Sequence, residues 1–311
     1  MNENRRSLAT KSLPALAALG LFAGLSQALA QEGGRESGGA ESGDAFETKH
    51  IFGFTEGTDV GSAGGRELEF TTTAYIGKRG GGRYRALEQE ATYEAAPSSR
   101  FGYEATLHGV SQQIGNVPGL NNLSQTTFSG ASVTPKWILL ARGVDAPIGL
   151  AVSLQPEYDR IDPVIGANAN NLVLASRVYL DAELIENKLY GAVNLIFSPE
   201  VESVAGDGVS QYALFGATAA LTYRVTPALA LGGEIELYET FDSLGWRQWS
   251  GSASYLGPTL HWQVTPKAFV AIAWSAQIAN RLPDNTATAL ALVNQSDISR
   301  QRGRLTFSVE F

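Results

Sequence analysis

The last ten residues of the chain, Arg302-Gly-Arg-Leu-Thr-Phe-Ser-Val-Glu-Phe311, decide the fold class. From residue 304 onward, apolar and polar side chains alternate strictly. Successive side chains of a β-strand point to opposite faces, so this stretch predicts a strand with Leu305, Phe307 and Val309 on one apolar face. The chain therefore ends on a half-apolar strand whose last residue is aromatic.

A closing strand of this kind resembles the insertion signal of bacterial outer-membrane β-barrels, which the barrel assembly machinery recognises. The segment Phe52-Gly-Phe-Thr-Glu-Gly-Thr-Asp59 resembles the opening of uncharacterised proteobacterial outer-membrane proteins. Both resemblances imply an all-β, antiparallel, up-and-down transmembrane barrel of the porin or transporter type in the outer membrane of a Gram-negative bacterium. Neither implies a particular activity.

The amino-terminal residues have the three parts of a secretory signal peptide. A basic start precedes an apolar run over residues 13–25, and Ala28-Leu-Ala30 provides a small-x-small cleavage site. We therefore expect residues 1–30 to be a signal peptide and residues 31–45, which are almost entirely Gly, Ser and acidic residues, to be a disordered leader. Residues 46–66 are interpreted as a lead-in that packs at or inside the barrel, or alternatively as a plug.

The net charge disfavours one class of partner. The chain carries 23 Lys and Arg against 31 Asp and Glu, and the expected signal peptide removes three of the basic residues and one of the acidic ones. The remaining 20 basic and 30 acidic residues disfavour nucleic-acid binding, which needs positive charge. The chain has no Cys, so disulfides and thiol chemistry are excluded. Beyond the signal peptide, no apolar run of about 18 residues predicts a transmembrane helix.

Residues 67–311 divide into extended segments of about ten residues separated by turn residues, which is the signature of a transmembrane β-barrel. We predict twelve strands, an even number. They cover residues 67–77, 83–95, 100–110, 129–141, 148–160, 171–184, 189–200, 211–225, 228–240, 252–264, 267–279 and 302–311.

The connections between these strands alternate in length. An outer-membrane barrel has short periplasmic turns and longer external loops, so the alternation predicts that both termini are periplasmic. The external connection over residues 78–82 is short and is the exception. A soluble antiparallel sandwich is the alternative fold, but it explains neither this asymmetry nor the signal peptide. The long connections cover residues 111–128, 161–170, 201–210, 241–251 and 280–301.

If the apolar faces contact lipid, the opposite faces line the lumen and set its charge. Charges belong there because Lys or Arg on the lipid face would cost about 2–4 kcal/mol at the bilayer midplane. Acidic residues outnumber basic ones on these faces. The predicted lumen and selectivity residues are Glu67, Glu69, Glu88, Glu90, Glu94, Glu104, His108, Lys136, Glu157, Asp159, Arg177, Asp181, Glu183, Arg224, Glu234, Glu236, His261 and Arg304.

Aromatic residues lie on the apolar faces, several of them near strand ends. This placement is typical of the girdles that mark the two interfaces of a membrane barrel. The predicted girdle residues are Trp137, Tyr223, Trp262, Trp274, Phe307 and Phe311.

Two interpretations of the acidic wall remain open. The Glu residues can form an internal ion-pair network with Lys136, Arg177, Arg224 and Arg304 that braces a narrow barrel, or the wall can favour cations along a solute pathway. Barrels of about eight strands are filled by side chains and those of about sixteen to eighteen are open, so twelve strands predict a narrow lumen. We expect a cation-favouring channel or transporter for small solutes, without a cofactor.

Two other functions are considered. An outer-membrane enzyme acting on lipid or lipopolysaccharide would need a nucleophile and a base, but His108 and Ser111 are three residues apart on a strand and so point to opposite faces. No catalytic residue is assigned. A structural or recognition barrel would act through the loops at 111–128 and 280–301. With three His and no Cys, a transition-metal site is not expected, whereas a hard cation on carboxylates remains possible.

Overall fold

The computed structural model describes residues 47–143, 146–204, 208–281 and 298–311. The predicted signal peptide and leader lie outside the described residues. No helix within the described ranges is long and apolar enough to span a bilayer.

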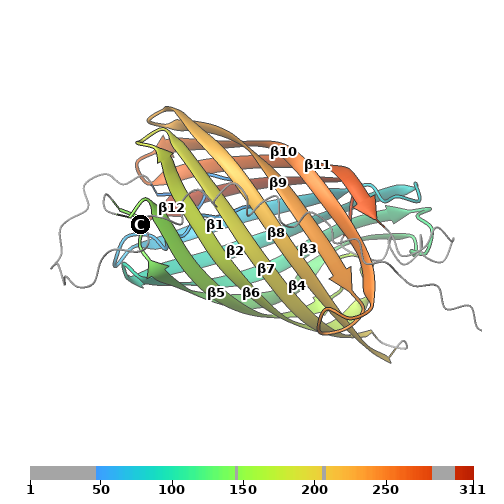
Figure 1. Cartoon of the computed structure of the whole chain (residues 1–311). Coiled ribbons are helices and arrows are strands. Elements are labelled where there is room, and N and C mark those ends of the chain that lie inside the picture. The colour runs from blue at the N-terminus through green and yellow to red at the C-terminus, as the bar shows by residue number, and fades with distance from the viewer. Residues whose placement is uncertain (1–46, 144–145, 205–207, 282–297) are drawn as a thin grey trace, which may run out of the picture. The chain divides into compact units, whose positions relative to one another are not determined.

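The described residues form a closed antiparallel barrel of twelve β-strands, which confirms the predicted fold class (Figure 1). Each strand pairs with its neighbours in sequence, so the topology is up-and-down. The strands are β1 (Arg66–Ile76), β2 (Arg83–Ser98), β3 (Phe101–Gly115), β4 (Leu123–Leu140), β5 (Ile148–Ile161), β6 (Asn168–Ile185), β7 (Leu189–Val204), β8 (Gly208–Thr226), β9 (Leu229–Phe241), β10 (Trp249–Thr265), β11 (Ala268–Arg281) and β12 (Gln301–Glu310).

The carboxyl-terminal strand closes the barrel, as its sequence pattern predicts. β12 pairs antiparallel with β1 in a register that sets Glu67 opposite Glu310 and Thr73 opposite Arg304. The backbone N–H of Phe311 extends this seam by donating to the carbonyl of Arg66 at 3.0 Å. Closure leaves no free strand edge among the twelve strands, so their backbone groups pair within the sheet.

The two faces of the wall differ as the alternation predicts. On β1, Leu68 and Phe70 are 42% and 54% exposed on the outside, whereas Thr71 and Thr73, which follow them with the opposite parity, are buried in the lumen. An apolar outside suits contact with lipid tails, and a polar inside suits a lumen.

The connections at the two ends of the barrel differ less in length than expected. The end that carries the connections 99–100, 186–188, 227–228 and 266–267 is called the turn end below, and the opposite end is called the loop end. The predicted loop over residues 111–128 is wrong in extent, because β3 continues to Gly115 and β4 starts at Leu123. The strands continue through polar residues here because the hydrogen bonds between β3 and β4 join backbone groups and need no apolar side chain. The side chain of Gln125 adds a further hydrogen bond across the pair by donating to the Gln112 amide oxygen at 2.7 Å.

Candidate functional site

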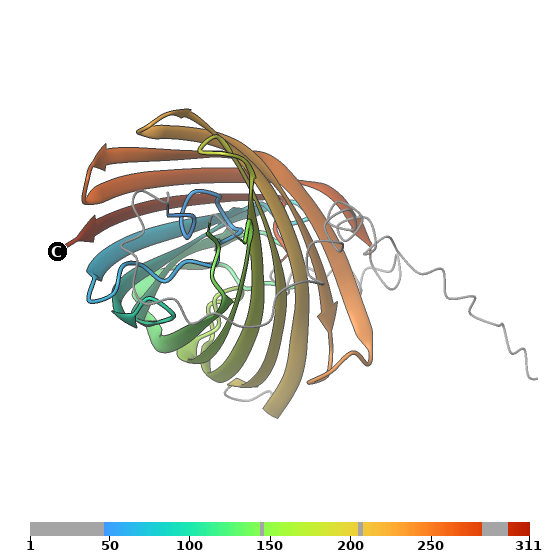
Figure 2. The same cartoon turned by 60° about the vertical axis from the view of Figure 1, so that its left-hand side comes forward.

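Residues 47–65, called the inner segment below, lie within the ring of strands (Figure 2). They have no helix or strand of their own. Nevertheless Ile51 and Phe52 are each only 1% exposed, because they pack against Tyr190, Ala192 and Ala220 on the lumen side of β7 and β8. The inner segment therefore belongs to the core of the barrel.

Asp181 on β6 anchors the two ends of the inner segment together. Its carboxylate accepts hydrogen bonds from the hydroxyl of Thr48, and from the N–H and hydroxyl of Thr58 at 3.1 and 2.9 Å. Arg142, from the connection between β4 and β5, donates to the same carboxylate at 2.6 Å and to Asp59 at 3.1 Å. The Arg142 and Asp181 side chains are 6% and 0% exposed, so this is a buried, fully hydrogen-bonded ion pair.

The middle of the inner segment is held by its backbone. The N–H groups of Phe54 and Thr55 donate to the carboxylate of Glu234 on β9 at 2.9 and 3.0 Å. The N–H and carbonyl of Glu56 pair with the side-chain amide of Asn194 on β7, each at 2.8 Å. Backbone groups without secondary structure need such partners when they are buried.

Glu56 faces the wall with its side chain. Arg177 on β6 donates to its carboxylate at 3.0 Å. Burial alone raises the pKa of Glu56, but Arg177 and Lys136 together lower it below its ordinary value. Lys136 also donates to the carbonyl of Gly57 at 2.7 Å and lies 4.1 Å from the ring centre of Tyr179.

Lys49 inserts between two carboxylates of the wall. Its ammonium pairs with Glu94 on β2 and lies 2.8 Å from Glu104 on β3. Burial alone lowers the pKa of Lys49, but Glu104 and Glu94 raise it well above its ordinary value. Lys49 therefore stays charged and neutralises part of the acidic wall.

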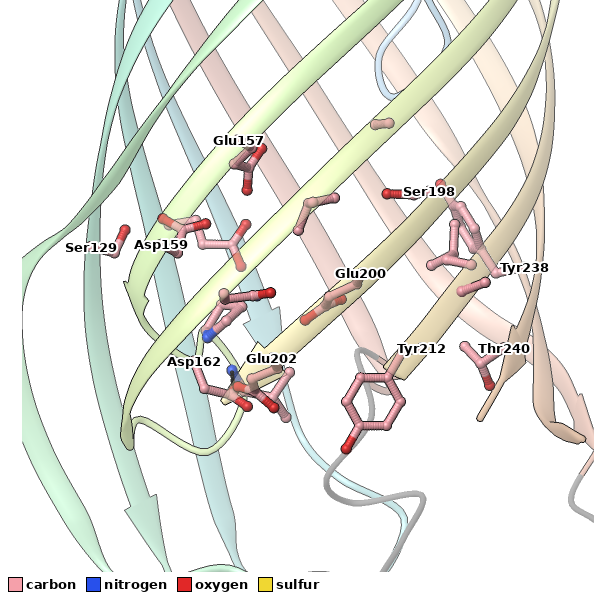
Figure 3. Close-up of a pocket in the computed structure, with 18 of the residues that line it drawn as sticks. Ser129, Glu157, Asp159, Asp162, Ser198, Glu200, Glu202, Tyr212, Tyr238 and Thr240 are labelled. Carbon is pink, nitrogen blue, oxygen red and sulfur yellow. Dashed lines mark hydrogen bonds between the residues drawn. The ribbon is translucent and has the colours of Figure 1, made fainter. Parts of the chain in front are cut away.

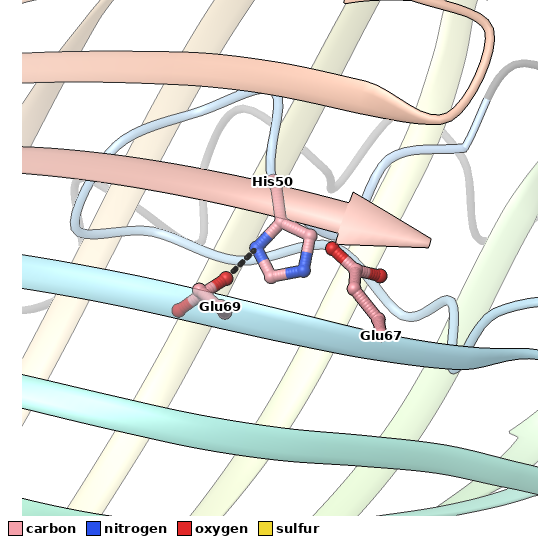
Figure 4. Close-up of side chains that lie close together, drawn as sticks. All are labelled: His50, Glu67 and Glu69. Carbon is pink, nitrogen blue, oxygen red and sulfur yellow. Dashed lines mark ion pairs between the residues drawn. The ribbon is translucent and has the colours of Figure 1, made fainter. Parts of the chain in front are cut away.

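His50 lies beside β1, between the carboxylates of Glu67 and Glu69 (Figure 4). Its Nδ1 is 3.4 Å from Glu69, and its ring stacks on Phe269 with centroids 5.0 Å apart. Burial, reinforced by nearby positive charge, lowers the pKa of His50 well below its ordinary value, so His50 is neutral at neutral pH. The charged and titratable groups around it are Lys49, Glu67, Glu69, Glu94, Lys136, His261 and Arg304.

A cavity of about 840 Å³ occupies the loop-end half of the lumen (Figure 3). Eight acidic residues line it, against three Arg. Phe54 of the inner segment also lines it and so marks where the cavity meets that segment. The acidic residues are Glu88, Glu90, Glu157, Asp159, Asp162, Glu200, Glu202 and Asp242, and the basic ones are Arg177, Arg302 and Arg304.

A second cavity of about 110 Å³ lies between the inner segment and the wall. Its lining includes Lys49 and His50 from the inner segment and the predicted lumen residues Glu69, Glu94 and Glu104. It shares four lining residues with the large cavity, so the two adjoin. The shared residues are Glu90, Gln155, Arg177 and Arg304.

Arg302 lies among aromatic rings where the cavity meets the inner segment. Its guanidinium carbon is 4.4 Å from the ring centre of Phe54 and 5.0 Å from that of Tyr238. Its Nη1 donates to Glu236 at 2.5 Å. Rings on several sides and a carboxylate hold the cation in one place.

The structure divides the predicted lumen residues into three groups. One group contacts the inner segment: Glu69, Glu94, Glu104, Lys136, Arg177, Asp181, Glu234 and Arg304. A second lines the large cavity: Glu88, Glu90, His108, Glu157 and Asp159, with Arg177 and Arg304 shared. The third makes contacts along the wall: Glu67, which also lies beside His50, with Ser308, Glu183 with Tyr190, Arg224 with Pro227, Glu236 with Arg302, and His261 with Phe269.

The expected pairing of basic and acidic wall residues takes a different form. Arg177 pairs with Glu56, and Arg304 donates to the Gly53 carbonyl at 3.3 Å, so these cations serve the inner segment. The register sets Arg304 opposite Thr73, four rungs along β1 from Glu69. Cations that pair with wall carboxylates include Lys49, Arg142 and Arg302.

Sequence reasoning missed these three cations for separate reasons. Lys49 precedes the predicted strands, and Arg142 was assigned to a turn. Arg302 begins the last strand and has the same parity as Arg304, so its inward direction was available from the alternation.

Five of the six predicted girdle residues lie near the turn end on the outer face. Trp137, Tyr223, Trp262, Phe307 and Phe311 are 42–58% exposed there. Trp274 is also exposed but sits midway along β11, so it does not join this group. The strands are staggered and sequence alone cannot locate their ends, so the position of Trp274 along β11 could not be predicted.

His108 and Ser111 do not meet. The His108 Nε2 lies 2.9 Å from the hydroxyl of Ser132 and lines the cavity, whereas Ser111 bonds to Thr126 at an exposed position. The nucleophile and base expected of the enzyme alternative are therefore on opposite faces of β3.

A closed twelve-stranded barrel with an apolar outside and a polar cavity has the fold of outer-membrane β-barrels, the fold that channels and porins also adopt. The chain belongs to a family of unknown function (DUF6662), whose model matches residues 44–311. Among curated proteins, none matches the chain.

Solved structures share this fold at low sequence identity. The COG4313 outer membrane channel from Pseudomonas putida F1 is 14% identical, with a TM-score of 0.52 over 82% of this chain and 98% of that one. The NanC porin is 12% identical, with a TM-score of 0.46 over 78% of this chain and 98% of that one. The KdgM porin in complex with disordered oligogalacturonate is 10% identical, with a TM-score of 0.44 over 79% of this chain and 99% of that one.

Proposed function

We propose that this protein is an outer-membrane channel for small solutes, with a cation-favouring lumen that the inner segment narrows as a plug. The observation that carries the proposal is the acidic cavity and its continuation beside the inner segment. Eight carboxyl-bearing residues against three Arg favour cations over anions in this part of the lumen.

The narrow part of the path favours small solutes. The cavity beside the inner segment holds about 110 Å³, compared with about 840 Å³ in the loop-end half. A water molecule takes up about 30 Å³ of liquid, so this passage has room for a few waters or a hydrated ion. Larger solutes require the inner segment to move.

The proposed placement in the membrane follows from the apolar outer face of the barrel. In this proposal the turn end and both termini face the periplasm, lipid and lipopolysaccharide surround the apolar face, and β12 engages the barrel assembly machinery. The channel makes no covalent change to its solute. The separation of His108 and Ser111 supports this assignment, because the lipid-hydrolysing alternative depended on that pair.

Planar bilayers test the channel. Under a KCl gradient, purified protein is expected to conduct and to show a reversal potential shifted toward that of K⁺. Replacing either Glu88 or Glu200 with Gln should reduce this preference, because both residues line the large cavity and neither lines the cavity beside the inner segment. Glu186→Gln, at an exposed turn, is the charge-matched control. Absent conductance, or anion preference in the unmodified protein, would refute the proposal.

A further inference from the structure

The wall of the large cavity brings one imidazole and two carboxylates together. His108 on β3 and Glu157 and Asp159 on β5 each offer a ligand atom, and these atoms all lie within 4.8 Å of one another. Figure 3 shows Glu157 and Asp159, two residues apart on β5, both facing the cavity. Nitrogen and oxygen ligands of one tetrahedral ion, each about 2.0–2.2 Å from the metal, lie roughly 3.4 Å from one another, so the three side chains would have to close by about 1 Å around a bound ion.

Register explains why residues distant in sequence meet here. His108 pairs with Gly130, Gly130 with Asp159, and Asp159 with Asn171, so the four lie in one row across strands β3 to β6. The pairing shifts between His108 and Gly109 because Ser129 is an extra, bulged residue on β4, and this bulge bends β4 at this point. Gly130 is required because an added Cβ would lie 2.0 Å from the backbone carbonyl oxygen of Tyr158.

Two oxygen atoms in this row lack a donor. Asp159 and Asn171 are 6% and 3% exposed, and the Oδ1 atom of each has no hydrogen-bond partner among the described residues. Leaving a buried acceptor unsatisfied costs about 1–3 kcal/mol. Both atoms belong to the row that holds the ligand cluster, where a bound cation would satisfy them.

We propose that His108, Glu157 and Asp159, with Asn171 as a fourth ligand, bind a divalent first-row transition-metal ion within the cavity. One nitrogen and three oxygen ligands suit Mn²⁺ or Zn²⁺ better than Ca²⁺, which prefers oxygen alone. Ser132 supports the site through its hydroxyl, 2.9 Å from His108 Nε2, and Glu90 lies 3.8 Å from Nδ1. This site revises the expectation, drawn from composition, that the chain has no transition-metal site.

Metal titration of the full-length barrel in detergent tests the site independently of conductance. After chelator treatment, MnCl₂ is added while the signal of free Mn²⁺ is followed by electron paramagnetic resonance, and ZnCl₂ is then added as a competitor. We expect one Mn²⁺ per barrel, displaced by Zn²⁺ but not by equimolar CaCl₂.

Variants distinguish the loss of a metal ligand from the loss of a negative charge elsewhere in the cavity. Asp159→Asn and His108→Gln are each expected to weaken binding by about tenfold or more, whereas Glu88→Gln, in the same cavity but outside the cluster, should change it by less than about twofold. With Co²⁺ as the probe, His108→Gln should also alter the visible spectrum, since a nitrogen ligand is lost. Heat-modifiable mobility on gels checks that each variant is folded. Binding that is absent, or that Glu88→Gln weakens as much as Asp159→Asn, would overturn the proposal.

Discussion

At the scale of single residues, Asp181 controls how firmly the inner segment is held. Asp181→Asn removes the charge that faces buried Arg142 and weakens the bonds to Thr48 and Thr58. Breaking a buried ion pair from one side costs about 3–5 kcal/mol, so we expect the inner segment to be released in a much larger fraction of molecules.

Limited trypsin digestion measures this release, because Lys49 is 4% exposed when the segment is docked. Cleavage after Lys49 should be faster in Asp181→Asn than in the unmodified protein. Glu186→Gln makes a similar charge change at an exposed turn and should leave the rate unaltered. Equal cleavage in all three proteins would show that Asp181 does not anchor the segment.

His50 makes the docking dependent on pH. In the docked segment its pKa lies well below the ordinary value, so it stays neutral, whereas a released His50 takes up a proton as pH falls through about 6.5. The contribution of His50 to docking is therefore at full strength above about 6.5 and is lost progressively below it, whereas Glu47, whose pKa burial raises to about 7, contributes with the opposite sign. Conductance should rise as the pH is lowered from 7.5 to 5.0, and His50→Gln should flatten that rise. A rise of equal size in the variant would assign it to other groups.

At the scale of elements, β12 closes the barrel through its last residues. Phe311 donates its N–H to Arg66, and its ring centroid is 6.5 Å from that of Tyr93 on β2. Deleting Phe311 is expected to reduce the amount of heat-modifiable barrel in the outer membrane, since the seam loses a hydrogen bond and an aromatic contact. Phe311→Tyr keeps both and should assemble normally. Normal abundance after the deletion would contradict this role.

The turn between β1 and β2 shows how a cluster of glycines in the sequence marks a hairpin tip. Gly77, Gly81 and Gly82 have φ angles of +75°, +83° and +77°, a region that favours glycine. Their cluster therefore marks a hairpin tip at the loop end, and no helix follows it.

At the scale of the whole molecule, the inner segment decides how much of the lumen is open. Removing residues 48–58 takes away the inner wall of the narrow cavity, so single-channel conductance should increase by about threefold or more toward that of an unplugged barrel. Cation preference should persist, because the cavity carboxylates remain. An unchanged conductance in planar bilayers would show that the segment does not obstruct the path.

Sequence alone determined the barrel. Alternation with a period of two is a local property, so the twelve strands, their inward and outward faces and the closing role of residues 302–311 could be predicted from it. Strand ends were less certain, as at 111–128, because hydrogen-bonded ladders continue through polar residues.

Tertiary structure alone decided the contents of the lumen. Lys49 meets Glu94, and Asp181 meets Thr58, across 45 and 123 residues, and neither pair has a signal in local spacing. His108 and Asp159 become neighbours only when register and a bulge align three strands. The alternation reports which way a side chain points, but the partners it meets depend on barrel closure and on a chain segment that carries no periodic pattern.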